Sequence, residues 1–174
     1  MINLNQNSNI RRIDELGRLV IPKDIRKKLH IMDNEPLEIF IENNEIRIKK
    51  YSALPDIIEY IKYLVDIGSR ITKNNYIVTD RTHIIASSNK EYLDEELATV
   101  IESYVLSGAE IKNDLMELKL SNKFEINAYI NIEPILIDND RSGIIIEYND
   151  KIKLENDNVI KLFKNLIEKK FNNY

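Results

Sequence analysis

Apolar and polar residues alternate regularly between residues 37 and 49. The aliphatic side chains of residues 37–42 and 45–49 fall at every second position, which predicts two strands that each have one apolar face. Asn43 and Asn44 lie between them and tolerate a positive φ. We therefore expect a tight β-hairpin.

The segment before this hairpin alternates short apolar and basic stretches. Residues 10–14 are expected to form a short strand, Gly17 gives backbone freedom to a loop at 15–18, and the fully apolar residues 19–21 suit a buried strand. Pro22 favours an extended residue before it and the start of a helix after it, which we place at residues 23–30.

The rest of the chain predicts an α+β domain on an antiparallel sheet, because most of its strands are joined by short turns while the helices lie elsewhere. Helices are expected at 56–71, 93–106 and 159–171, and strands at 76–79, 82–87, 115–120, 124–137 and 143–148.

The first and last of these helices carry wide apolar arcs, roughly 220° and 180° at 100° per residue. One face can pack on the sheet, and the remainder of the first helix, with Ile61 and Leu64, is expected to contact another subunit. For the last helix, a wide but ordinary core face is an equal alternative.

These patterns divide the chain into a polar tail at 1–9, a first module at 10–51, a joint at 52–55 and a second domain at 56–174. A module of about 45 residues buries little apolar surface alone and usually needs disulfides, a metal or a partner chain. The chain has no cysteine, and His30 and His83 alone are a poor metal site. We therefore expect an intertwined dimer.

Charge is unevenly distributed. Residues 10–31 contain seven lysines and arginines against three acids, a local charge of +4, so the overall charge of −4 leaves −8 for the rest of the chain. Such asymmetry is typical of a nucleic-acid-binding end.

Other chemistry is sparse. No cysteine nucleophile, glycine-rich phosphate loop or catalytic constellation is apparent, so we expect neither an enzyme nor a cofactor. The N-terminus lacks the pattern of a signal peptide, and no apolar run approaches the ~20 residues of a membrane span. A cytoplasmic location is expected.

The run Arg11-Arg12-Ile13-Asp14-Glu15-Leu16-Gly17-Arg18-Leu19-Val20-Ile21-Pro22, followed by Ile25-Arg26-Lys27-Lys28-Leu29, resembles the AbrB family of bacterial transcription regulators. This resemblance implies a swapped-hairpin β-barrel shared by two chains. The segment 77–87 and the order of elements after the barrel resemble the sporulation group of that family, which implies a GAF-like sensor domain and regulation of sporulation or stationary-phase genes.

The resemblance also implies which residues contact DNA. In the family, arginines on the loops and helix of the basic face do so, and by position these are Arg11, Arg18 and Arg26. Further basic positions are Arg12, Lys23 and Lys27. Lys27 departs from the arginine usual at its place and lacks the planar fork that binds phosphate or guanine with two hydrogen bonds. Asp14 and Glu15 are expected to orient guanidinium groups.

The expected partners are therefore double-stranded DNA, a second chain through the barrel, and a homotetramer through the second domain, with an unidentified small-molecule effector. An alternative function is that of an antitoxin, because the same barrel occurs in toxin–antitoxin pairs. Those chains usually continue in a short disordered tail, whereas this one continues in a patterned domain.

Overall fold

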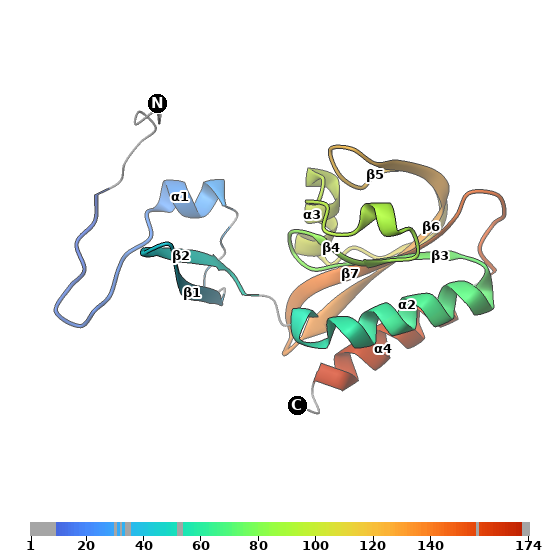
Figure 1. Ribbon diagram of the computed structural model, residues 1–174. Coiled ribbons are helices and arrows are strands. Elements are labelled where there is room, and N and C mark those ends of the chain that lie inside the picture. Colours follow the sequence, from blue (N-terminus) through green and yellow to red (C-terminus); the bar gives the residue numbers. More distant parts are fainter. Residues whose placement is uncertain are drawn as a thin grey trace. The chain divides into compact units, whose positions relative to one another are not determined.

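A computed structural model describes residues 10–29, 31, 33, 36–51, 54–155 and 157–171. Its contacts divide the chain into two compact units, Met1–Tyr51 and Ser52–Tyr174 (Figure 1). The units are described here one after the other.

The first unit consists of a short helix and a hairpin. Its elements are α1 (Lys23–Lys28), β1 (Leu37–Glu42) and β2 (Glu45–Lys50). The strands pair antiparallel with Ile39 opposite Ile48 and Ile41 opposite Ile46, and Asn43 and Asn44 make the turn with φ of 50° and 64°. The predicted hairpin is confirmed, and its four isoleucines share one face.

Two predicted strands of the first unit are wrong for the single chain. Residues 10–14 and 19–21 adopt neither helix nor strand, and Leu19 and Val20 are exposed rather than buried. A strand needs a neighbour to hydrogen-bond with, and β1 and β2 already pair with each other. The end of the predicted helix at His30 lies outside the described residues.

The second unit contains a five-stranded sheet and three α-helices. The strands are β3 (Asn75–Thr79), β4 (Ile84–Ser87), β5 (Ile111–Lys119), β6 (Glu125–Ile137) and β7 (Asp140–Asn149), arranged in the order β4-β3-β7-β6-β5. All neighbours are antiparallel. The helices are α2 (Ile58–Thr72), α3 (Thr99–Ser107) and α4 (Asn158–Phe171), with short 3-10 turns η1 (Leu54–Ile57) and η2 (Lys90–Tyr92). This confirms the α+β prediction and is consistent with a GAF-like domain.

The helix predicted at residues 93–106 is shorter than expected, because α3 begins at Thr99. The preceding segment uses its backbone elsewhere: Glu95 accepts from the Ile84 amide, Leu97 donates to Thr82, and Ala98 donates to Leu120. Tertiary hydrogen bonds therefore override the apolar period of residues 93–98.

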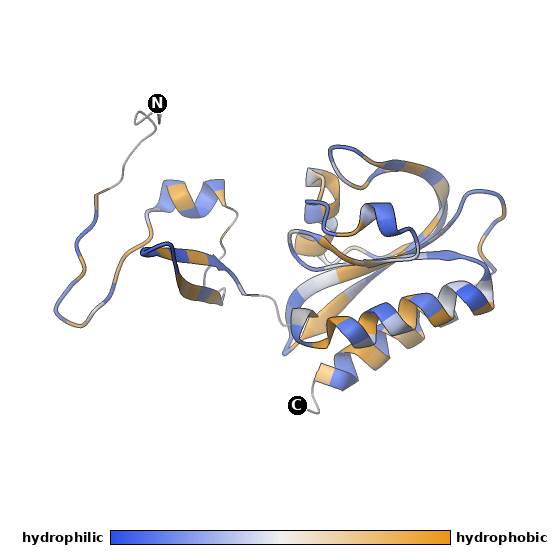
Figure 2. Cartoon of the chain, in the orientation of Figure 1, coloured by the Kyte–Doolittle hydropathy of each residue, from blue (hydrophilic) through white to orange (hydrophobic). Residues whose placement is uncertain are grey.

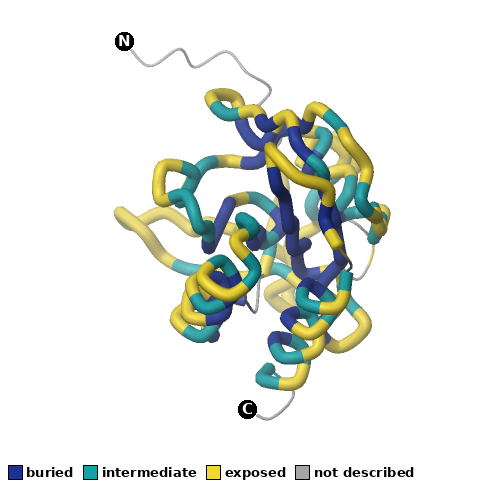
Figure 3. Tube along the Cα trace, turned by 90° about the vertical axis from the view of Figure 1, so that its right-hand side faces the viewer, coloured by how far each residue is buried: buried dark blue, intermediate teal, exposed yellow. Residues whose placement is uncertain are grey.

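The sheet has an apolar layer on each face. Helices α2 and α4 run side by side over one face, where Leu54, Ile61, Tyr76 and Phe163 are buried, and α3 covers the other face. Figure 3 shows the buried strands between helices whose outward sides are exposed. This unit has a complete core of its own.

Helix α2 exposes apolar side chains outside its own core, as predicted, but two of the residues predicted to contact another subunit are buried instead. Ile61 and Leu64 are buried in the core of their own unit, whereas Tyr63 and Ile71 are 61% and 74% exposed. On α4, Leu162 is 54% exposed. Figure 2 shows apolar and polar residues alternating along both helices. A wide apolar arc does not reveal which of its positions meets the sheet.

A buried polar network crosses the sheet on the side of α2. The carboxylate of Glu147 is 2% exposed and accepts hydrogen bonds from the Tyr76 hydroxyl at 2.7 Å and from the side-chain amides of Asn74 at 2.9 Å and Asn131 at 2.8 Å. Asn149 donates in turn to Asn74. These bonds offset the cost of burying a carboxylate.

Candidate nucleic-acid interface

The basic loop at residues 14–18 is organised around one carboxylate. Asp14 accepts from the backbone amides of Leu16 and Arg18 through Oδ1, and from Arg18 Nε through Oδ2 at 2.7 Å. Gly17 has a φ of +76°, a conformation that favours glycine. Asp14 therefore orients the Arg18 guanidinium, as expected from the sequence.

The same contacts affect the titration of Asp14. Hydrogen bonds from the Arg18 amide and guanidinium hold the pKa of Asp14 below its ordinary value, against a small opposing effect of burial. The carboxylate therefore stays ionised to a lower pH than an ordinary aspartate. The side chain of Arg18 remains 72% exposed for contact with another molecule.

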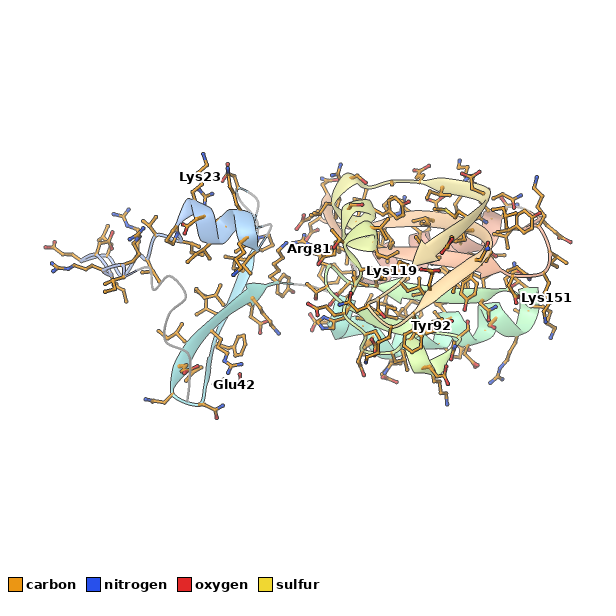
Figure 4. All side chains as sticks on the ribbon, turned by 90° about the horizontal axis from the view of Figure 1, so that it is seen from above. Lys23, Glu42, Arg81, Tyr92, Lys119 and Lys151 are labelled. Carbon is orange, nitrogen blue, oxygen red and sulfur yellow. The ribbon has the colours of Figure 1, made fainter. Side chains whose placement is uncertain are left out.

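Helix α1 carries the second group of cations. Lys23 and Lys27 are exposed, and Figure 4 shows Lys23 extending from α1 away from the hairpin. Arg26 is half-buried, with 37% of its side chain exposed, and donates from Nη1 to Asp33 at 2.6 Å. Asp33 lies seven residues from Arg26, beyond the end of α1, so this pairing could not be read from a helical period.

Arg11 and Arg12 complete the predicted set, and both are exposed. Arg11 donates to the carbonyl of Ile10 and borders an apolar hollow of about 320 Å³. The hollow is otherwise lined by Leu19, Val20, Ile21, Pro22, Ile25, Leu29, Ile31 and Ile48. All six predicted residues thus belong to one unit that carries cations beside an apolar hollow.

Several charged residues of the second unit pair with one another. Arg81 bonds the Arg141 carbonyl at 2.7 Å and pairs with Asp140, while Glu133, which is 3% exposed, faces Lys164 at 3.6 Å. Burial raises the pKa of Glu133, and nearby Lys164 opposes that shift.

Groups for other chemistry are not assembled in the described part of the chain. Within it, no three histidine, cysteine or acidic side chains are close enough to hold a metal ion, and no helix is long and apolar enough to cross a membrane. His83 is exposed and lies beside the Thr82 hydroxyl, and His30 lies outside the described residues. The basic face of the first unit is therefore the candidate site.

Comparison with known proteins covers both units. The chain is 31% identical over 147 residues to the stage V sporulation protein T of Bacillus subtilis (strain 168), an alignment that spans 80% of this chain and 82% of that protein. The chain belongs to the stage V sporulation protein T family. This alignment is long enough to include parts of both units of the chain.

The first unit alone has further relatives. It is 45% identical over 42 residues to the transition state regulatory protein AbrB and 40% identical over 42 residues to the putative transition state regulator Abh, both of Bacillus subtilis (strain 168). These alignments cover 24% of this chain and 44% and 46% of those proteins. Residues 10–56 also match the family described as antidote-toxin recognition MazE, bacterial antitoxin.

Proposed function

We propose that this member of the family is a DNA-binding transcription regulator of sporulation or stationary-phase genes, and not an enzyme. The observation that carries the proposal is the basic set of the first unit, of which five of six members are exposed, in a segment similar to two transition state regulators. Lysines and arginines neutralise phosphates and release counterions, while arginines also bind guanine with two hydrogen bonds. A regulator of this kind acts in the cytoplasm, where the chromosome lies.

The DNA-binding form is a dimer in this proposal. The described part of the first unit has no buried residue, and Ile39, Ile41 and Ile46 are between 67% and 80% exposed. Such an apolar surface is stable only when covered. A second copy of the unit would cover it by forming a swapped-hairpin barrel, and residues 10–14 and 19–21 would find their strand partners in that barrel.

Duplex binding tests this proposal directly. Fluorescence anisotropy with labelled promoter DNA should give a log–log salt dependence steeper than about −3, since each neutralised phosphate contributes ~0.9. Binding that does not change with salt would contradict it. An unrelated duplex of equal length measures the part of the affinity that is independent of sequence.

The second unit is proposed to join two dimers into a tetramer. Tyr63, Ile67 and Ile71 lie along α2 at spacings of four residues, and Leu162 is exposed on the neighbouring α4. Paired with the same stripe of another chain, they would form an intersubunit helix bundle. Four chains would place two barrels on one DNA and raise their effective concentration there.

Light scattering on the full chain tests the tetramer. Tyr63→Glu with Ile71→Glu should halve the measured mass, whereas Ser103→Glu, at an exposed position of α3 on the other face, should leave it unchanged. A wild type that stays dimeric at micromolar concentration would rule out the tetramer. The dimer proposal would stand.

An antitoxin is the second candidate function, favoured by the match of residues 10–56 to the MazE description. That match ends where the sheet unit begins, and the relative that covers both units is a sporulation protein. Expression together with the neighbouring genes and affinity purification distinguishes the two. A small toxin co-purifying at equal stoichiometry would favour the antitoxin.

A further inference from the structure

A polar pocket of about 320 Å³ lies in the second unit on the flank of α2 that faces β4. Its volume is at the lower end of the range of small-molecule sites, roughly 300–1,000 Å³. The pocket is lined by Lys62, Val65, Asp66, Ser69, Arg70, Ser87, Ser88, Lys90 and Leu93. Two apolar side chains, three hydroxyls and four charged groups therefore meet in one hollow.

The charges of this pocket are unbalanced. Three cations against the single carboxylate of Asp66 leave a formal charge of +2 among the lining residues. Arg70 is held by Asp66 at 2.9 Å, and Lys62 by Glu59 at 3.0 Å. Lys90 is exposed and has no ion-pair partner among the residues that the structure describes. One cation is therefore available to a ligand.

Hydrogen-bond donors are also available. Within the described chain, the Ser69 hydroxyl has no hydrogen-bond partner. The Ser87 hydroxyl accepts from the Asn89 amide, which leaves its own proton for another acceptor. These donors and Lys90 suit an acceptor-only group with several oxygens, and Val65 and Leu93 provide apolar contact for the rest of a small molecule.

The pocket and the exposed apolar stripe occupy different sides of α2. At ~100° per residue, Lys62, Asp66 and Ser69 are centred roughly 130° from Tyr63, Ile67 and Ile71. A ligand in the pocket therefore does not compete with helix pairing through the stripe. It would contact the same helix and so could favour one arrangement of paired helices over another.

We propose that this pocket binds the oxyanion group, phosphate or carboxylate, of a small metabolite, with Lys90 and the Ser69 and Ser87 hydroxyls as its ligands. This inference gives a chemical class to the small-molecule effector that the sequence resemblance implies for the second unit. Its regulatory consequence rests on the proposed function. Binding itself does not, so the test contains no DNA and can fail or succeed independently.

Binding can be measured with the full chain at constant ionic strength. Inorganic phosphate is followed by phosphorus-31 line broadening, and succinate, as the carboxylate probe, by proton saturation transfer. Lys90→Glu should weaken binding by about tenfold or more, because it removes a charge-assisted hydrogen bond and adds repulsion. Lys153→Glu is the matched control, being exposed and adjacent to Leu154, whose backbone bonds Asn113 on the far edge strand β5.

The two charge-reversal variants carry the same net charge, so phosphate bound by the basic first unit contributes equally to both. Ser69→Leu, which fills the pocket without changing charge, should weaken binding as well. Response to phosphate alone would identify a phosphorylated ligand, and response to succinate alone a carboxylate. Equal binding by Lys90→Glu and Lys153→Glu, or no response to either probe in the wild type, would overturn the proposal.

Discussion

The two units of this chain solve the problem of a hydrophobic core in opposite ways. Among the described residues of the first unit none is buried, although its hairpin and the segment before it are rich in isoleucine, leucine and valine. The second unit buries comparable residues on both faces of its own sheet. Apolar content alone therefore does not make a core. The number of layers that one chain can supply decides whether it folds alone or with a copy of itself.

The largest effect is expected from a test of the proposed two-chain core of the first unit. Ile46→Glu places a charge on the apolar face shared with Ile41, so barrel formation and DNA binding should be lost while the second unit keeps its thermal transition. DNA-binding titration and calorimetry measure the two outcomes. Lys49→Gln, on the other face of the hairpin, is the control and should bind DNA with little change. If Ile46→Glu binds DNA as a monomer, the two-chain core is disproved.

The second unit should instead be sensitive to a change inside one chain. A Cβ at Gly143 would lie 1.9 Å from the Thr79 carbonyl oxygen, which is part of the neighbouring strand. Gly143→Ala should therefore lower the free energy of unfolding of this unit by about 3 kcal/mol. A Cβ at Gly17 would meet open space. Gly17→Ala should therefore lower the free energy of unfolding of the first unit only by the strain of its positive φ, about 1 kcal/mol. Chemical denaturation followed by circular dichroism measures both losses of unfolding free energy, and equal losses would contradict this prediction.

The basic set of the first unit should affect binding without affecting either core. Arg18→Ala removes an exposed guanidinium and should weaken DNA binding by about 1–3 kcal/mol if it contacts a base edge, at unchanged thermal stability. Arg47→Ala, in β2 and outside the basic set, removes the same charge from an arginine that is also paired with an acid, Glu42, and serves as the control. Anisotropy titrations on one duplex compare them. Equal losses would mean that only net charge matters.

The smallest effect concerns pH and the second unit alone. Burial raises the pKa of Glu133 in the folded state, so folding takes up a proton, and the contribution of this group to stability is greatest at low pH and lost as pH rises through the raised pKa. Glu133→Gln should flatten this decline and change the free energy of unfolding near neutral pH by less than about 1 kcal/mol. Denaturation at several pH values checks it. If the free energy of unfolding fell more steeply with rising pH in the variant, the direction assigned to the Glu133 contribution would be wrong.

Local patterns predicted the elements whose partners are near in sequence. The hairpin followed from alternation around Asn43 and Asn44, and α2 and α4 from their apolar periods. What failed depended on distant contacts. The strand expected at 19–21 has no strand partner among the described residues of its own chain. The segment 93–98 bonds β4 and Leu120 instead of forming a helix, and Ile61 rather than Tyr63 meets the sheet.

The candidate site was predictable in its residue types more than in its geometry. The basic run and its glycine predict which residues contact DNA, and the structure shows that Asp14 orients Arg18 as expected. The pairing of Arg26 with Asp33 had no sequence signal, because seven residues with a helix end between them fix no distance. The oxyanion pocket was missed for the same reason, since α2, β4 and η2 contribute its residues from separate segments.

The buried Glu147 also bears on how the sheet finds its register. Strands β6 and β7 are so rich in isoleucine that sliding one past the other by two residues would still place isoleucine against isoleucine. Glu147 lies directly opposite Asn131 on one side and Tyr76 on the other, so any slip would separate the carboxylate from its donors inside the core. One acidic residue thereby removes the degeneracy of a repetitive sequence, and the three central strands align in a single way.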